Sequence, residues 1–155
     1  MTIKKYYNIA KTKLFPITRS LTGDGVKKTL NIMQKEFPKL KIKKFKSGTK
    51  VFDWNIPEEW NVTDAYIIDK YNNKIIDFKR NNLHLVGYSV PIKKNITKKE
   101  LFKNLYFLKN QPKAIPYITS YYKRRWGFCT SYNEYKILDK RYSLNDKFKV
   151  VINSN

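Results

Sequence analysis

The alternation of hydrophobic and polar positions predicts two helices near the start of the chain. The clearer one spans residues 24–37 and has an apolar stripe formed by Val26, Leu30, Met33 and Phe37. Asp24 can cap this helix, and Pro38 ends it. A weaker pattern formed by Ile3, Tyr7, Ala10 and Leu14 predicts an earlier helix that ends at Pro16.

The spacing changes to that of β-strands after Pro38. Residues 39–46 alternate between apolar and basic side chains, which predicts a strand with one solvent-exposed face. Residues 64–69 and 74–78 flank Tyr71-Asn72-Asn73, a sequence typical of a hairpin, because asparagine tolerates positive φ. Further strands are predicted at 83–90, ended by Pro91, and at 147–152.

A capping box at Thr97-Lys98-Lys99-Glu100 predicts one more helix, with an apolar face continuing to Leu108. Residues 110–116 carry two prolines and are expected to form a loop. Residues 117–122 and 126–129 are aromatic and β-prone, and 131–138 has the composition of a short helix. The fold class predicted from these patterns is α+β.

Composition narrows the classes of function. The 155 residues carry a net charge of +21, mostly from dispersed lysines rather than clustered arginines, so we expect at most weak, salt-sensitive binding of polyanions and no specific nucleic-acid recognition. No apolar run is long enough for a membrane span, and the first residues lack the pattern of a signal peptide. The single cysteine, Cys129, excludes an internal disulfide, and a cytoplasmic location is expected.

Few residues are candidates for chemistry. One histidine and one cysteine, without ligand-like partners at helical spacing, predict no metal site and no catalytic residue in this chain. His84 is interpreted as a structural or surface histidine, with a ligand as the alternative. Cys129 is interpreted as a small buried side chain, although the basic residues at 123–125 keep a reactive thiol open.

The aromatic and cationic run Tyr121–Trp126 could hold a nucleotide, a sugar or a peptide carboxylate, or it could be a surface strand with Trp126 inward. If any residues face substrate, we expect Arg125 and Trp126, with His84 behind them. The aromatic residues at 52, 54 and 60 are interpreted as core packing at a structural boundary.

Four motifs in fixed order carry a resemblance to a known family. They are Leu14–Gly25 (LFPITRSLTGDG), Ser47–Trp60 (SGTKVFDWNIPEEW), Asn82–Pro91 (NLHLVGYSVP) and Ile115–Cys129 (IPYITSYYKRRWGFC). Together they resemble a prokaryotic aminopeptidase-like family, in which a zinc-exopeptidase-type core is interrupted by an inserted domain of unknown function and followed by a winged helix. Some members are named as polysaccharide-biosynthesis proteins. The family's metal-binding stretches have no counterpart in this sequence.

The resemblance implies a domain plan and a function. Residues 1–46 would be the N-terminal helical segment of the exopeptidase-like core, 47–138 the inserted β-rich domain with one helix, and 139–155 a return strand into the core. The chain would be an N-terminal part of a zinc exopeptidase, not catalytic alone, with zinc held only in the full-length protein. The alternative is a non-catalytic module that docks on a separate peptidase core or binds polyanions.

Three expectations about partners follow from this plan. The missing core would be supplied by the same or an adjacent reading frame. The strand at 148–152 would lack its partners, so the chain is expected to form homo-oligomers. No membrane partner is expected.

Overall fold

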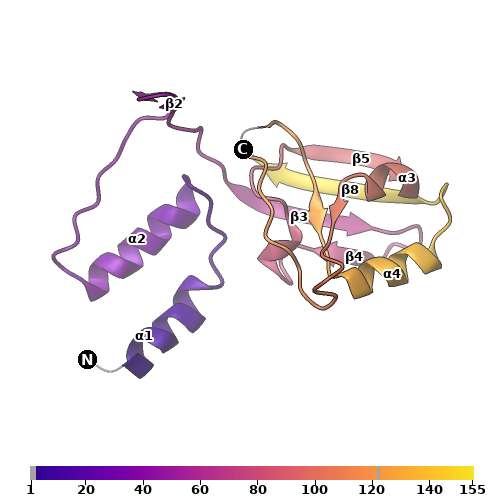
Figure 1. The fold of residues 1–155 in the computed structure, drawn as a ribbon, viewed down its shortest axis with the longest axis horizontal. Coiled ribbons are helices and arrows are strands. Elements are labelled where there is room, and N and C mark those ends of the chain that lie inside the picture. Colours follow the sequence, from indigo (N-terminus) through magenta and orange to yellow (C-terminus); the bar gives the residue numbers. More distant parts are fainter. Residues whose placement is uncertain (1–2, 122) are drawn as a thin grey trace. The chain divides into compact units, whose positions relative to one another are not determined.

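The computed structural model describes residues 3–121 and 123–155 (Figure 1). Contacts within the chain form two units, one up to Asn61 and one from Val62 to Asn155. None of the described helices is long and apolar enough to cross a membrane.

The two predicted helices are present in the first unit. Helix α1 (Ile3–Ile9) continues into one π-helical turn (Ala10–Leu14), and α2 spans Asp24–Glu36. The rings of Tyr6 and Phe37 stack at 5.6 Å between centroids, and the Lys5 ammonium lies 2.6 Å from the Glu36 carboxylate. These contacts tie the two helices together.

The start of α2 differs from the prediction. Gly23 occupies the N-cap position with φ +107°, and no side chain at that position accepts a hydrogen bond, so Asp24 is not the cap. Instead, the Asp24 amide donates to Asn61 Oδ1 at 2.7 Å, and the Thr22 hydroxyl donates to the Glu58 carbonyl at 2.9 Å. Residues 58–61 therefore stabilise the turn that begins the helix.

The predicted strand at 39–46 is wrong, because this segment pairs with no strand among the described residues. It leads into a short hairpin formed by β1 (Lys50–Val51) and β2 (Trp54–Asn55), which lies beyond the end of α2 along the chain (Figure 1). An alternating pattern becomes a strand only where a neighbouring strand supplies hydrogen bonds.

In the second unit, an antiparallel sheet has the order β4-β3-β8-β5. Its strands are β3 (Val62–Ile68), β4 (Lys74–Asp77), β5 (Ile92–Thr97) and β8 (Lys147–Ser154). The β3–β4 hairpin forms as predicted, with Asn72 at φ +65° in its turn. Fully or almost fully buried side chains from three strands form the core: Ala65, Ile67, Ile76, Phe148, Val150 and Ile152.

The expectation of an unpartnered strand at 148–152 is wrong. Strand β8 is central, because it pairs with β3 from Val62↔Ser154 to Ile68↔Lys149 and with β5 from Ile92↔Ile152 to Thr97↔Lys147. Residues 147–154 thus belong to the second unit's own sheet. The contacts divide the chain at 61/62, whereas the sequence placed boundaries at 46/47 and 138/139.

The predicted capping box is confirmed, but its helix is shorter than expected. Helix α3 spans Lys98–Phe102, after which Leu105–Tyr106 (β6) pairs in parallel with Phe128–Cys129 (β7). Tertiary pairing therefore overrides the helical spacing of Leu105 and Leu108. Helix α4 (Tyr132–Arg141) begins with a second capping box formed by Ser131 and Glu134, so the described part of this unit holds two α-helices.

The predicted strand at 83–90 is also wrong as a regular strand. Asn82–His84 forms a 3₁₀ turn, and only single bridges follow, Leu85↔Phe128 and Gly87↔Thr119. The backbone then folds back at Tyr88, which has φ +61°. This interrupted segment forms hydrogen bonds to the backbone of Arg125 and Gly127.

Candidate functional site

The backbone of residues 85–90 is held between two other segments. On one side, the Val86 amide donates to the Gly127 carbonyl and the Val90 amide to the Arg125 carbonyl, both at 3.1 Å. On the other side, the Gly87 amide donates to the Ile118 carbonyl at 2.9 Å, and the Ser120 amide donates back to Gly87 at 2.8 Å. This arrangement fixes the strand-like run that carries Arg125 and Trp126.

A left-handed residue lies in the middle of this arrangement. Tyr88 has φ +61°, a region that costs a non-glycine residue about 1–2 kcal/mol. The buried Ser89 hydroxyl donates to the Val86 carbonyl at 2.6 Å and accepts from the Gly127 amide at 3.2 Å, which keeps the turn closed. The Tyr88 ring meets Tyr121 edge-on at 5.5 Å.

Arg125 is exposed and lies against Tyr106. Its guanidinium carbon is 5.4 Å from the ring centroid, and Nη1 donates to the Tyr106 hydroxyl at 3.3 Å. None of the ion pairs between described residues includes Arg125. A stacked guanidinium without a carboxylate partner can bind the carboxylate or phosphate of a ligand. Trp126 beside it is half-buried.

Gly127 explains why Tyr106 can lie so close. A Cβ at this position would stand 2.7 Å from Tyr106 Cε2 and 3.0 Å from Val86 Cγ2. The tyrosine ring therefore packs on bare backbone, and a larger residue would displace the surface that Arg125 rests on.

His84 differs from Arg125 in its burial and in its hydrogen-bond partner. It is buried, and its Nδ1 lies 2.8 Å from the Cys129 carbonyl, so Nδ1 carries a hydrogen and donates it to that oxygen. This hydrogen bond is to the backbone of Cys129, whereas the Arg125 guanidinium lies on the Tyr106 ring. Among the three sequence-predicted candidates, Arg125 is exposed, Trp126 is half-buried and His84 is buried.

Cys129 is fully buried, and burial raises the pKa of its thiol to about 12, against a weaker opposing hydrogen bond from the Ile118 backbone. The thiol is protonated at neutral pH, which disfavours the nucleophile considered for it. No group of three or more His, Cys, Asp or Glu that could hold a metal ion occurs within residues 3–121 and 123–155.

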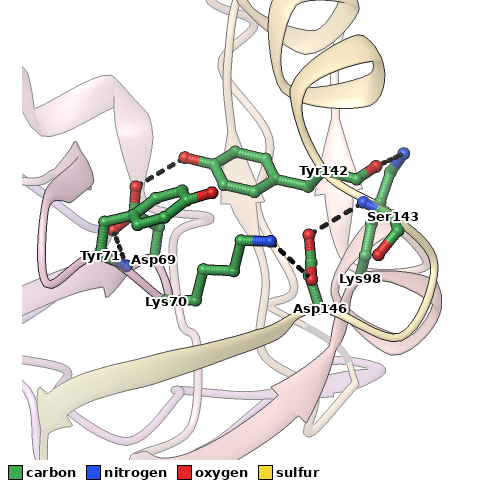
Figure 2. A network of polar contacts seen from close by, with 7 residues as sticks. All are labelled: Asp69, Lys70, Tyr71, Lys98, Tyr142, Ser143 and Asp146. Carbon is green, nitrogen blue, oxygen red and sulfur yellow. Dashed lines mark hydrogen bonds and ion pairs between the residues drawn. The ribbon is translucent and has the colours of Figure 1, made fainter.

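A partly buried polar network was not found by sequence reasoning (Figure 2). The Asp69 carboxylate accepts from the Tyr142 hydroxyl at 2.6 Å and from the Asn73 amide at 2.8 Å. Lys70 donates to Asp146 at 3.0 Å, and the Lys98 ammonium donates to the Tyr142 carbonyl at 2.8 Å. The position of Asp69 just before the predicted asparagine turn was the one sign of this network in the sequence. Its partner, Tyr142, lies 73 positions away, so the pairing itself could not be predicted.

The arrangement of this network indicates a structural role. It joins the β3–β4 turn to the connection between α4 and β8 and to the start of α3. The buried charges of Asp69 and Lys98 in it are each met by donors or acceptors, as expected of groups that hold a fold together.

Comparisons with known proteins support the resemblance seen in the motifs. Residues 59–155 match the family model described as "Domain of unknown function (DUF2172)", a span that nearly coincides with the second unit. A Clostridium acetobutylicum protein named "Putative polysaccharide biosynthesis protein with aminopeptidase-like domain" is 48% identical over 149 residues, which make up 96% of this chain and 33% of that protein. The chain thus spans about a third of the length of this curated relative.

A solved structure is also similar to this chain. The crystal structure described as that of a "putative peptidase" from Clostridium acetobutylicum superposes with a TM-score of 0.84 at 45% identity. The match covers 99% of this chain and 37% of the solved one. The predicted family and the α+β fold class are confirmed.

Proposed function

Since this chain belongs to the DUF2172 family, we propose that it is a non-catalytic part of an aminopeptidase-like protein that docks on a peptidase core. Its relatives are named as aminopeptidase-like or peptidase proteins, and this chain corresponds to only 33–37% of their length. The core would be supplied by the same or an adjacent reading frame.

The observation that carries this proposal is the exposed apolar surface of the first unit. Side chains that usually lie inside a protein are more than half exposed there: Ile3 88%, Tyr7 60%, Phe15 63%, Leu21 61%, Phe45 71% and Phe52 92%. Exposed apolar side chains mark a protein interface where they gather into one patch. We propose a peptidase core as the partner, because the longer relatives are named as aminopeptidase-like or peptidase proteins.

Zinc is expected in the full-length family protein, and the described residues do not fit it. They contain no group of three His, Cys, Asp or Glu side chains, whereas a catalytic zinc takes about three protein ligands. We therefore propose that the ligands and the chemistry belong to the core, and that this chain contributes surface rather than reacting groups.

Co-expression tests the proposal. The 155-residue chain is produced with the polypeptide corresponding to the rest of the Clostridium acetobutylicum relative, and hydrolysis of aminoacyl p-nitroanilides is measured for each polypeptide and for both. We expect the two to co-purify, with hydrolysis by the pair and none by this chain. Stoichiometric zinc in the purified chain, or hydrolysis by the chain alone, would refute it.

Within this function, Arg125 and Trp126 are the residues we propose to face substrate. The exposed, stacked guanidinium suits a peptide carboxylate. Arg125→Gln should raise KM of the reconstituted pair with little change in kcat, because uniform binding is lost. His84 is buried, so His84→Gln should instead lower stability without a selective effect on KM. An unchanged KM for Arg125→Gln would exclude the substrate contact.

The alternative function is binding of polyanions, which the net charge of +21 favours. It predicts sequence-blind binding of DNA, RNA or heparin that weakens steeply as salt rises. A sequence preference that persists at high salt would instead indicate specific recognition. We also propose the cytoplasmic location that was expected from the sequence. Cell fractionation tests this location.

A further inference from the structure

Residues 37–56 of the first unit, called the basic arm below, combine features that a self-contained unit would avoid. Residues 40–46 form neither helix nor strand, and a two-stranded hairpin follows. The hairpin is extended by hydrogen bonds from the Gly48 amide to the Ile56 carbonyl at 2.8 Å and from the Ile56 amide to the Thr49 carbonyl at 2.9 Å. A hairpin of this size is marginally stable in water without further packing.

The tip of the hairpin places an aromatic side chain in solvent. Val51 pairs with Trp54, which leaves Phe52 and Asp53 as the turn. Phe52 has φ +52° and is 92% exposed, while Trp54 beside it is 44% exposed. Glycine or asparagine is usual at such a φ, so phenylalanine adds backbone strain and gains no burial here. Strained residues of this kind cluster at binding elements and switch regions.

The charge of the arm is one-sided. Residues 37–56 contain six lysines, at positions 39, 41, 43, 44, 46 and 50, and one acidic residue, Asp53 in the hairpin turn. All six lysines are exposed, and none takes part in an ion pair between described residues. The exposed Leu40 and Phe45 are interleaved with them. Such a surface is complementary to an apolar pocket bordered by carboxylates.

We propose that the basic arm is the element that binds the peptidase core, with Phe52 inserted into an apolar pocket and the lysines against acidic residues around it. This inference rests on the proposed function. The unpaired segment 40–46 adds a strand to an open sheet edge of the core, which gives its apolar and basic alternation a role.

The length of the solved relative supports a peptidase core as the partner of the basic arm, rather than a lipid surface. A chain that matches this one with a TM-score of 0.84 is nearly three times as long, and its remaining part is absent here. A covalently continuous or co-encoded core is thus the surface that an arm of this sequence would meet. Six lysines would also attract an anionic membrane, so that alternative is tested directly.

The test compares matched variants of the full 155-residue chain, each purified alone and then titrated with the separately purified rest of the Clostridium acetobutylicum relative. Phe52→Asn keeps a residue that accepts positive φ and removes the ring, while Tyr117→Asn removes a ring that is 72% exposed in the second unit. Affinity is measured by calorimetry. We expect Phe52→Asn to lose at least about thirtyfold, as for a central interface anchor, and Tyr117→Asn to lose less than about twofold.

A second set of variants tests the charge of the basic arm. Replacing Lys41, Lys43 and Lys44 together by Gln should weaken binding and reduce its dependence on salt, whereas replacing Lys93, Lys94 and Lys99 should leave both unchanged. The two sets remove equal charge from the two units, so net charge alone cannot account for a difference.

The outcomes separate the two proposals. If the wild-type chain and the core do not associate, the proposed function fails and this inference fails with it. If they associate and Phe52→Asn binds as tightly as wild type, the proposed function stands and the arm is excluded as its contact. Binding to phosphatidylglycerol vesicles that Phe52→Asn abolishes, with unchanged affinity for the core, would overturn the inference in favour of a membrane.

Discussion

A carboxylate and a tyrosine hydroxyl from distant parts of the sequence meet inside the second unit. Burial raises the pKa of Asp69, but the hydrogen bonds from Tyr142, Asn73 and Tyr71 outweigh it and hold that pKa below its ordinary value. Burial and the same bond raise the pKa of Tyr142 to about 12. Asp69 is therefore charged and Tyr142 neutral across the physiological range.

Tyr142→Phe should destabilise the second unit by about 1.5–3 kcal/mol, because a hydrogen bond to a charged, buried group is lost. The lowered pKa of Asp69 contributes stability that is present above its unfolded value and is lost as pH falls through the folded one. Removing the hydroxyl raises that folded pKa, so acid unfolding should begin at higher pH. Urea melts at several pH values measure both effects.

Tyr117→Phe is the matched control for this experiment, because Tyr117 is 72% exposed. It should change neither the urea midpoint nor the acid midpoint. An unchanged acid midpoint in Tyr142→Phe would show that the other donors suffice for Asp69.

Cys129 offers a second test with a single residue. Because the pKa of the buried thiol is about 12, a disulfide reagent at pH 8 should label the native chain far more slowly than the chain in guanidinium. The labelling rate should follow unfolding of the second unit. Rapid labelling of the native chain would mean that β7 is accessible.

These residues show where sequence reasoning reaches its limit. The turn at Asn72 followed from a local preference, and the burial of Cys129 from its apolar neighbours. The Asp69–Tyr142 bond spans 73 positions, and no local pattern encodes it. Arg125 and Trp126 were named from composition, whereas the Tyr106 ring beneath Arg125 became evident only once β6 paired with β7.

Among the elements, α4 depends on a lysine from α3. The buried Lys98 ammonium donates to the Asp139 and Tyr142 carbonyls at 2.7 and 2.8 Å and lies 2.7 Å from the Asp139 carboxylate. It thus satisfies carbonyls at the end of α4, where a cation is also favoured by the helix dipole.

Lys98→Met should destabilise the second unit by about 1–3 kcal/mol, since carbonyls at the end of α4 lose their donor. Amide hydrogen exchange should quicken most in the last turn of α4. Lys99→Met alters the adjacent, exposed lysine and should leave exchange unchanged. Equal effects of the two substitutions would indicate that total charge matters, not the contact.

The elements that sequence predicted correctly are those with local signals. Capping at Thr97 and the asparagine turn each need only a few neighbouring residues. The strands predicted at 39–46 and 83–90 failed because their alternating patterns describe which faces could be buried, and pairing depends on strands elsewhere.

At the scale of the whole molecule, the order of strands decides which parts can fold alone. We expect residues 62–155 to fold by themselves, because the sheet and its core lie within that range. A chain ending at Asp146 should lose the sheet of the second unit, because β8 joins β3 to β5. Circular dichroism and NMR dispersion of the two pieces test this, and a folded chain without β8 would contradict the sheet order.

The central place of β8 also bears on how the protein is made. Strand β3 can close its hairpin with β4 as soon as both emerge from the ribosome, but its other edge meets β8 only after more than 80 further residues are made. Strand β5 has no partner in the sheet until then. High contact order of this kind slows folding and leaves strand edges open on the nascent chain, which makes binding of a chaperone during synthesis an expected step.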